Sequence, residues 1–360
     1  MADTKARRLK IVPRAMRPTE VRAVRELLER ARVARRELCS FALGSTGSWS
    51  RAVALSWGSW GVYGAAVRGR ETGEGQFETR ELLEVYRVHE MSESTRMFGL
   101  CGAPIGGSPS PALHAAGYRA LGIDAAYLPV ETADLDAFAS IVSEDALLPL
   151  EGFGVTIPLK ERVAARCAER DAFASCGAVN TVCVDAGRWA GFNTDAPAAL
   201  ALIRRHLDPK GTVAAIVGAG GTARAVASAL KEAGADVTLY ARNAARGQET
   251  ASAIGVAAAP LATLPDARWD LLVQAILAGC HGEEVLFRRF LDGRLVLDAA
   301  YGAEPTPLVR AARARGLAVL DGFDLLAAQA ALQFERLTGR PAPADAMAAA
   351  LQSWQSRTSA

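Results

Sequence analysis

The chain has 360 residues, half of them apolar, and its formal charges nearly cancel at +2. This length predicts two or three domains, and the balanced charge argues against nucleic acid and anionic membranes as partners. No apolar run is long enough for a membrane span, and the N-terminus lacks the apolar core of a signal peptide. We therefore expect a cytoplasmic protein that binds a small molecule.

The cysteine and histidine content excludes several kinds of site. Six cysteines form no CxxC pair, and only four histidines are present. A structural zinc site therefore lacks ligands, and a histidine-based catalytic triad has little material. We predict no metal and free thiols, which is the ordinary state of cysteines in the cytoplasm. The cysteines are Cys39, Cys101, Cys167, Cys176, Cys183 and Cys280.

The first segment, residues 1–92, alternates short strands with helices. A helix is expected after Thr19, whose side chain can cap it, with an apolar stripe that begins at Val21. A second helix is expected at residues 81–88, and strands are expected at residues 9–12, 39–44 and 62–65. Three such units cannot close an eight-stranded barrel, so we predict a partial (β/α) barrel fragment with unpaired edges.

Polar cassettes mark the second segment, residues 93–205, where strands are expected at residues 97–100, 126–130 and 154–157. The cassettes place one lysine, one aspartate and two asparagines beside turn-forming glycine and proline. Singly, Lys160 is also compatible with a solvated lysine at a helix start, and Asn180 or Asn193 with a turn residue. The cassettes are Val155-Thr156-Ile157-Pro158-Leu159-Lys160, Gly177-Ala178-Val179-Asn180-Thr181 and Gly191-Phe192-Asn193-Thr194-Asp195.

A glycine fingerprint opens the third segment. An apolar strand at residues 213–217 precedes it, a helix is expected at 222–233, and a second strand at 236–240. Gly218, Gly220 and Ala223 fit the GxGxxA form of a dinucleotide site. A purely structural glycine turn is the alternative, which the flanking strand, helix and strand disfavour. We predict a Rossmann-type domain whose cofactor-binding residues include Gly218, Ala219, Gly220, Gly221, Thr222 and Ala223.

The turn after the second strand indicates which dinucleotide binds. Tyr240-Ala241-Arg242-Asn243 offers no acid to the ribose 2′-hydroxyl of NAD, whereas Arg242 and Arg246 can pair with a 2′-phosphate. We therefore predict NADP(H), with ordinary surface arginines as the alternative. A lysine and a carboxylate beside a dinucleotide suit reversible ketone-to-alcohol chemistry, because the cofactor carries the hydride and the protein must relay a proton.

Several further motifs stand in one order along residues 96 to about 345. Together with the cassettes and the glycine fingerprint, they resemble the shikimate dehydrogenase family. The resemblance implies an α/β substrate-binding catalytic domain at residues 93–205 with C-terminal helices at 322–356, and an NADP-binding Rossmann domain at residues 206–321. The further motifs are Gly102-Ala103-Pro104-Ile105, Ser108-Pro109-Ser110-Pro111, His114, Asp298, Tyr301, Thr306-Pro307-Leu308, Gly322, Leu326, Gln329, Gln333 and Phe334.

The resemblance also implies an activity: NADPH-dependent, reversible reduction of 3-dehydroshikimate to shikimate, in the shikimate pathway to chorismate and the aromatic amino acids. Lys160 would exchange a proton with the oxygen at the reacting carbon. Asp195 would keep that lysine charged and oriented. Contacts to the substrate carboxylate and ring hydroxyls would come from Ser108, Ser110, Thr156, Asn180, Tyr301 and Gln329.

The chain departs from the family pattern around the substrate mouth and the nicotinamide wall. Gly107 stands where histidine is usual, and Gln274-Ala275-Ile276-Leu277 replaces an Asn-Ala-Thr-Pro stretch, with Cys280 at a methionine position. Two alternatives follow. One is a quinate or quinate/shikimate dehydrogenase, whose substrate differs by one ring hydroxyl. The other is a non-catalytic nucleotide-binding subunit, which the intact Lys160 and Asp195 disfavour.

Lys10, Arg51 and Gln76 give residues 7–90 a resemblance of their own, to the C-terminal half of type I 3-dehydroquinate dehydratase. Lys10 would match the Schiff-base lysine, and Arg51 and Gln76 substrate-binding positions. The first half of the barrel and its catalytic histidine are absent, and a Schiff-base lysine needs a base. We expect vestigial positions without dehydratase activity. Truncation, a remnant and completion by another chain all fit the sequence, with self-association or a complementary half-barrel chain expected through residues 1–92.

Overall fold

The structure is a computed structural model that describes residues 6–144, 147–276 and 293–358, so Leu277 and Cys280 lie outside the described residues. The chain divides into two units. The first contains Met1–Arg162, Val182–Trp189 and Pro343–Met347, and the second contains Val163–Thr181, Ala190–Ala342 and Ala348–Ala360. Over the described ranges, no helix is long and apolar enough to cross a membrane.

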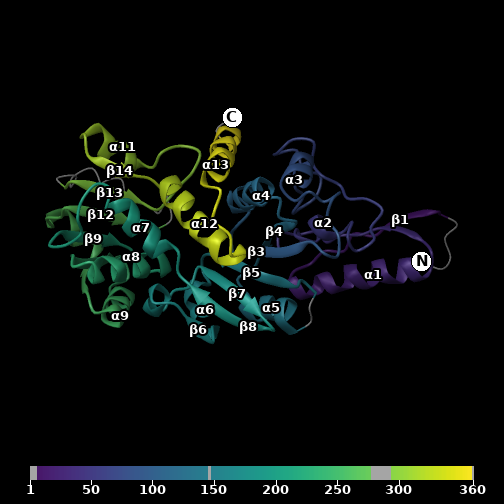
Figure 1. The fold of residues 1–360 in the computed structure, drawn as a ribbon, viewed down its shortest axis with the longest axis horizontal. Helices are drawn as coiled ribbons and strands as arrows, with labels where there is room; N and C mark the ends of the chain where they lie inside the picture. The colour runs from purple at the N-terminus through teal and green to yellow at the C-terminus, as the bar shows by residue number, and fades with distance from the viewer. Residues whose placement is uncertain (1–5, 145–146, 277–292, 359–360) are drawn as a thin grey trace. The chain divides into compact units, whose positions relative to one another are not determined.

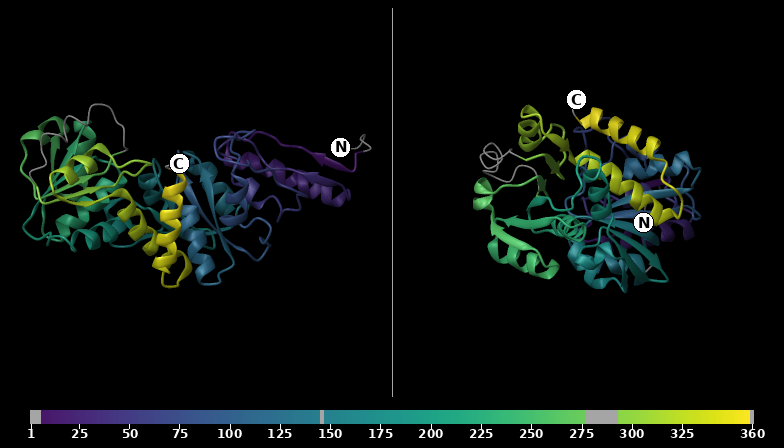
Figure 2. Two further views of the ribbon diagram at one scale, coloured as in Figure 1. Left: turned by 90° about the horizontal axis from the view of Figure 1, so that it is seen from above. Right: turned by 60° about the vertical axis from the view of Figure 1, so that its left-hand side comes forward.

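A two-stranded parallel sheet begins the first unit. It consists of β1 (Arg8–Lys10) and β2 (Glu37–Cys39), with Lys10 opposite Cys39. Between them runs α1 (Arg22–Val33), whose apolar stripe is buried; the helix lies alongside the sheet in Figure 2, drawn in purple. Two short helices follow, α2 (Ser50–Val53) and α3 (Thr79–Glu84).

Three expected features of this segment are wrong. The strand expected at residues 39–44 overlaps β2 only at Cys39, and beyond it a single bridge joins Leu43 to Arg14. Residues 62–65 form no strand, and a single bridge joins Ala65 to Glu78. Gly64 packs directly on Thr79, so closely that an added Cβ would lie 2.6 Å from the Thr79 hydroxyl oxygen. This close contact stands where a longer run of strand hydrogen bonds was expected. Thr19 caps no helix, because it lies inside the short 3-10 helix η1 (Pro18–Val21), where the fixed backbone of Pro18 begins the turn.

A six-stranded mixed sheet contains the strands expected in the second segment, and only two residues connect its neighbouring strands β7 and β8, which therefore run antiparallel (Figure 1). β3 (Arg96–Gly102) pairs with β4 (Ala125–Glu131) on one side and with β5 (Leu150–Val155) on the other. The strand order is β4-β3-β5-β7-β8-β6. The other strands and the helices here are β6 (Glu169–Arg170), β7 (Thr181–Asp185), β8 (Arg188–Phe192), α4 (Ser110–Ala120), α5 (Leu135–Ala139), η2 (Ser140–Glu144), α6 (Lys160–Arg166) and η3 (Phe173–Cys176).

A second six-stranded parallel sheet lies in the second unit, with the order β11-β10-β9-β12-β13-β14. Numbered along the chain this is 3-2-1-4-5-6, the order of a doubly wound dinucleotide-binding fold, so the predicted Rossmann-type domain is confirmed. Its strands are β9 (Val213–Val217), β10 (Asp236–Ala241), β11 (Ala257–Pro260), β12 (Leu271–Gln274), β13 (Leu295–Asp298) and β14 (Ala318–Leu320).

Helices cover both faces of this sheet (Figures 1 and 2). Ala225, Val226 and Leu230 of α8 (Gly221–Glu232) pack on one face with Ile254 of α9 (Ala244–Ile254), while Leu308 of α11 (Pro307–Ala314) packs on the other. α7 (Asp195–Ile203) joins the first of these cores. The remaining elements are η4 (Leu261–Asp266), α12 (Gly322–Thr338) and α13 (Ala344–Thr358).

Candidate active site

The glycine turn between β9 and α8 creates an open helix N-terminus. Gly218 has φ +123°, a backbone conformation that side chains disfavour, and its N–H donates to the Tyr240 carbonyl oxygen at 2.9 Å. Gly220 caps α8, and an added Cβ there would meet nothing within 4 Å. The turn before this twelve-residue helix therefore leaves space beside the helix N-terminus, which is the usual setting for a bound phosphate.

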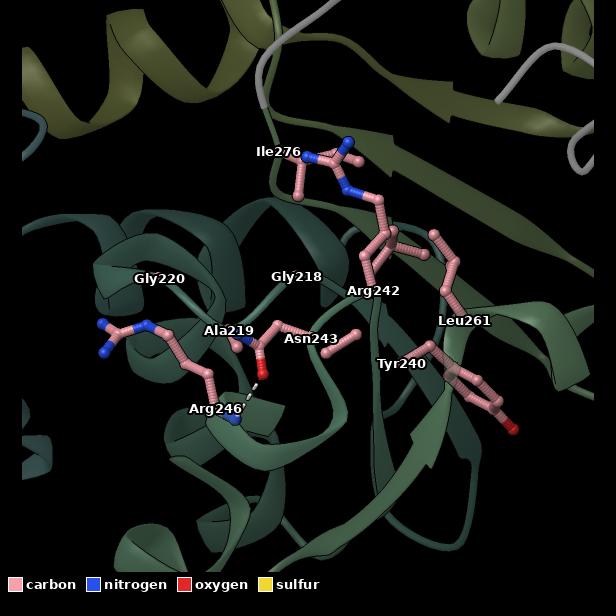
Figure 3. Close-up of a pocket in the computed structure, with 11 residues that line it drawn as sticks. Gly218, Ala219, Gly220, Tyr240, Arg242, Asn243, Arg246, Leu261 and Ile276 are labelled. Atoms are coloured by element: carbon pink, nitrogen blue, oxygen red, sulfur yellow. Dashed lines mark hydrogen bonds between the residues drawn. The ribbon is translucent and has the colours of Figure 1, made fainter. Parts of the chain in front are cut away.

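A pocket extends from this turn toward the end of β10 (Figure 3). The Asn243 side chain caps α9 by accepting a hydrogen bond from the Arg246 N–H at 3.0 Å, which fixes the turn that carries both arginines. The side chains of Arg242 and Arg246 extend from this turn in different directions. The described lining residues include two arginines and no acid: Val217, Gly218, Ala219, Gly220, Tyr240, Ala241, Arg242, Asn243, Arg246, Leu261 and Ile276.

This residue set fits a dinucleotide with an additional phosphate. The helix N-terminus suits a pyrophosphate, because its N–H groups and dipole favour negative charge. Arg242 and Arg246 suit a further phosphate, since a guanidinium binds one with two parallel hydrogen bonds. An acid at the end of β10 would instead select a ribose hydroxyl, and Ala241 stands there.

Asp195 lies at the first position of α7 in a buried hydrogen-bond network. Its side chain is 6% exposed. One carboxylate oxygen, Oδ1, accepts from Asn180 Nδ2 at 2.8 Å, and the other, Oδ2, accepts from the Thr222 hydroxyl at 3.3 Å. Asn180 is fixed in turn, since its Oδ1 accepts from the Thr194 N–H at 2.8 Å. The carboxylate is therefore held by two elements that come from different parts of the second unit.

Helix α12 contributes two glutamine side chains to this network. Gln329 Oε1 lies 3.4 Å from Asn180 Nδ2, and Gln333 Nε2 donates to the Thr181 hydroxyl at 2.9 Å. The sequence places both Gln333 and Thr194 in motifs, but it gives neither residue a role of its own. The Thr194 side chain makes no capping bond to α7; its hydroxyl oxygen instead accepts from Asn180 Nδ2 at 2.9 Å, a long-range contact that no local pattern indicates.

Asn193 has a structural function. Its Oδ1 accepts from the Ala196 N–H at 3.0 Å, and its Nδ2 donates to the Ala178 carbonyl oxygen at 2.8 Å. The side chain is 1% exposed, so these bonds satisfy a buried amide. The alternative of a turn residue, raised above for both asparagines, therefore describes Asn193.

The loop after β13 carries Tyr301, which is 37% exposed and packs on Phe323 with ring centroids 5.3 Å apart. Asp298 anchors this loop. Its Oδ1 accepts from the Ala300 N–H at 3.0 Å, and its Oδ2 accepts from the Thr306 hydroxyl. Burial raises the pKa of Asp298 to about 6, although both hydrogen bonds oppose that rise.

The first unit supplies the other residues expected at the site. Ser108 and Ser110 are joined at the start of α4, where the Ser108 hydroxyl donates to Ser110 Oγ at 3.1 Å. Thr156 directly follows β5, and its N–H donates to the Cys101 carbonyl oxygen at 2.9 Å. Lys160 is the first residue of α6. These four residues thus lie at the end of β5 and at the starts of α4 and α6, all in the first unit.

Lys10, Arg51 and Gln76 meet at a single residue, Tyr63. The Lys10 ammonium lies 3.7 Å from the centre of the Tyr63 ring. Arg51 Nη1 and Gln76 Nε2 both donate to the Tyr63 carbonyl oxygen at 3.3 Å. Arg51 is 2% exposed, and burial lowers its pKa to about 10. Residues far apart in the first segment therefore converge on Tyr63.

The described residues contain no group of three or more His, Cys, Asp or Glu side chains that could hold a metal ion. The five cysteines in the described ranges are all free thiols. Burial raises the pKa of the Cys167 thiol to about 11 and that of Cys101 further still. The thiolate, which is the reactive form, is therefore disfavoured at both positions.

A doubly wound sheet with an arginine-lined nucleotide pocket, beside a buried carboxylate network, defines a dinucleotide-dependent oxidoreductase of the α/β class. Two family models match the chain: the shikimate dehydrogenase substrate binding domain at residues 100–182, and the shikimate 5'-dehydrogenase C-terminal domain at residues 322–352. Neither covers residues 1–92.

Relatives of the chain indicate the same family as these two models. The chain is 39% identical to "Shikimate dehydrogenase (NADP(+))" of Halobacterium salinarum over 262 residues, which is 71% of this chain and 98% of that protein. It is 40% identical to the enzyme of the same name from Anaeromyxobacter sp. (strain Fw109-5), over 71% of this chain and 96% of that protein. The crystal structure of Thermus thermophilus shikimate 5-dehydrogenase with NADP(H) and shikimate aligns with a TM-score of 0.63 and 34% identity, covering 72% of this chain and 99% of that one. The chain belongs to the shikimate dehydrogenase family.

Proposed function

We propose that this chain catalyses the reversible NADPH-dependent reduction of 3-dehydroshikimate to shikimate, a step in aromatic amino acid biosynthesis. NADP(H) is its cofactor, in agreement with the relatives named NADP(+)-dependent. The observation that carries the proposal is the buried Asp195, held by Asn180 and by Thr222 of the glycine-turn helix. This arrangement gives a nucleotide-binding helix and a candidate catalytic carboxylate a shared hydrogen bond.

The residues would divide the work as follows. Bound NADPH supplies the hydride. Lys160 donates a proton to the carbonyl oxygen during reduction and takes it back from the hydroxyl during oxidation, while Asp195 orients the ammonium group. Asn180, Gln329 and Thr156 would contact ring hydroxyls. A buried donor or acceptor discriminates strongly, because a ligand without the matching hydroxyl leaves it unpaired.

Three further residues are proposed to contact the substrate carboxylate. Ser108 and Ser110 would bind the substrate carboxylate from the first turn of α4, and Tyr301 would lie near it. The same proposal assigns residues 93–205 with 322–356 to the substrate domain and residues 206–321 to NADP binding. The two family models, at residues 100–182 and 322–352, support the substrate part of this division.

A turnover assay tests the proposal. Purified protein is assayed for oxidation of shikimate and of quinate, each with NADP⁺ and with NAD⁺, by following nicotinamide absorbance. Shikimate with NADP⁺ should give the highest kcat/KM. A higher kcat/KM with quinate would favour the quinate dehydrogenase alternative. Saturable NADP⁺ binding without turnover of either acid would favour a non-catalytic nucleotide-binding subunit.

We also infer that residues 1–92 are a dehydratase-like half-barrel without activity of its own. The convergence of Lys10, Arg51 and Gln76 on Tyr63 supports the resemblance. Among the described strands, β1 and β2 pair only with each other, and each leaves one edge unpaired. Such edges favour pairing with another chain, so self-association or a complementary half-barrel is expected here. A cytoplasmic location stays a prediction from the sequence.

A further inference from the structure

Thr222 occupies the second position of α8, at the glycine turn, where the sequence assigns it to the cofactor. Its hydroxyl points elsewhere: Oγ1 donates to Asp195 Oδ2 at 3.3 Å. Asp195 begins another helix, α7, which packs against α8 in one core. A threonine of α8, the helix after the glycine turn, therefore donates to the carboxylate that the proposed mechanism uses.

The two oxygens of Asp195 have separate donors. Asn180 Nδ2 lies 2.8 Å from Oδ1, and the Thr222 hydroxyl lies 3.3 Å from Oδ2. A single donor leaves the carboxylate plane free to rotate about the Cβ–Cγ bond, whereas two donors on opposite oxygens fix that plane. The terminal torsion of aspartate is broad, so the second donor adds a restriction on it.

Orientation matters because, in the proposed function, the carboxylate oxygens of Asp195 orient the Lys160 ammonium group. A catalytic group displaced by about 1 Å or rotated away loses rate even when substrate and cofactor still bind. The Thr222 hydroxyl is directed to this carboxylate, while its backbone N–H belongs to the first turn of α8, beside the glycine turn. Thr222 would thus contact Asp195 through its hydroxyl and the bound nucleotide through its backbone N–H.

We propose that Thr222 is a positioning residue for Asp195, and that its hydroxyl couples the nucleotide-binding turn to the proton-transfer pair. This inference rests on the proposed function. It assigns to the side chain of Thr222 a role in turnover that is distinct from binding NADP(H).

The test compares Thr222→Val, which keeps the shape and removes the hydroxyl, with Thr222→Ser, which keeps the hydroxyl, in the full-length chain. Thr222→Val should lower kcat for shikimate oxidation about tenfold, the low end for a hydrogen bond to a charged group, because 3.3 Å is long for a hydroxyl donor. KM for shikimate and the calorimetric Kd for NADP⁺ should change less than about twofold, and Thr222→Ser should restore most of the lost kcat.

A double-mutant cycle separates positioning from a general structural effect. In an Asp195→Ala background, Thr222→Val should lower kcat less than about twofold, because the carboxylate that Thr222 orients is gone. An equal loss in both backgrounds, a Thr222→Ser protein as slow as Thr222→Val, or a weaker NADP⁺ Kd with unchanged kcat would each overturn the inference. Thr222→Ala replaces Thr222→Val if the valine variant melts at a lower temperature. Parent protein that does not oxidise shikimate refutes the proposed function directly, before any variant is compared.

Discussion

Asp298 offers a stability test whose magnitude follows from the structure. The side chain is 0% exposed, and burial raises its pKa from 3.8 to about 6. The folded protein therefore binds a proton more tightly than the unfolded chain. Its contribution to stability is fully present below pH 3.8 and is lost as the pH rises through about 6. The difference between a pKa of 3.8 and one of about 6 corresponds to roughly 3 kcal/mol of folding stability, most of which is lost between pH 4 and pH 7.

Asp298→Asn removes the charge and keeps the partners. The amide oxygen can accept from the Ala300 N–H, and the amide nitrogen can donate to the Thr306 oxygen. At pH 4 the variant and the parent should have similar free energies of unfolding. At pH 7.5 the variant should be the more stable protein, by up to about 3 kcal/mol.

Urea denaturation at half-unit steps from pH 4 to pH 8 measures this difference. The exposed Asp236 provides a matched control on the same sheet, and Asp236→Asn should show no comparable trend. Asp298→Ala, which loses both hydrogen bonds, should be less stable than Asp298→Asn at every pH. A difference between Asp298→Asn and parent that stays constant with pH, or that turns against the variant as the pH rises, would refute the reasoning.

The remaining predictions concern turnover. Lys160→Ala should leave the fold and NADP⁺ binding intact and lower kcat by roughly 10²–10⁴, the usual contribution of a positioned proton-transfer group; wild-type turnover would remove Lys160 from the mechanism. Arg242→Asp should erase or reverse the preference for NADP⁺ over NAD⁺, and equal kcat/KM with both cofactors in the parent would contradict the assignment. A chain that begins at Ser94 should oxidise shikimate as fast as the parent and be more monodisperse by light scattering; a folded but inactive product would show that residues 1–92 contribute to the site.

The nucleotide domain could be predicted from the sequence because its signals are local. The positive φ of Gly218 requires glycine, and the apolar runs on either side of the turn match the strand and helix that form there. The missing acid after β10 is likewise visible in a short stretch. Such features need no knowledge of distant residues, so pattern and structure agree closely.

The long-range bonds could not be predicted in the same way. Thr222 donates to a carboxylate 27 residues away, and Gln333 to a hydroxyl 152 residues away. The wrongly expected strand at residues 62–65 has the same origin. The apolar pattern of these residues suits a strand, but strand formation also depends on which backbone lies beside them. The family resemblance named Asn180 and Asp195 together, yet only the coordinates show Thr222 among their partners.

Arg51 of the first segment is a buried charge with weak hydrogen-bond compensation. Its guanidinium lies 4.2 Å from the Phe41 ring centre and donates to two carbonyl oxygens at 3.3 and 3.4 Å, and none of its hydrogen-bond partners in the described ranges is a carboxylate. Its Nε is buried without a partner among those residues. Burial of a charge with such weak compensation destabilises the folded state. A segment optimised only to fold would not need this residue, which supports the proposal that Arg51 is a vestigial substrate-binding position.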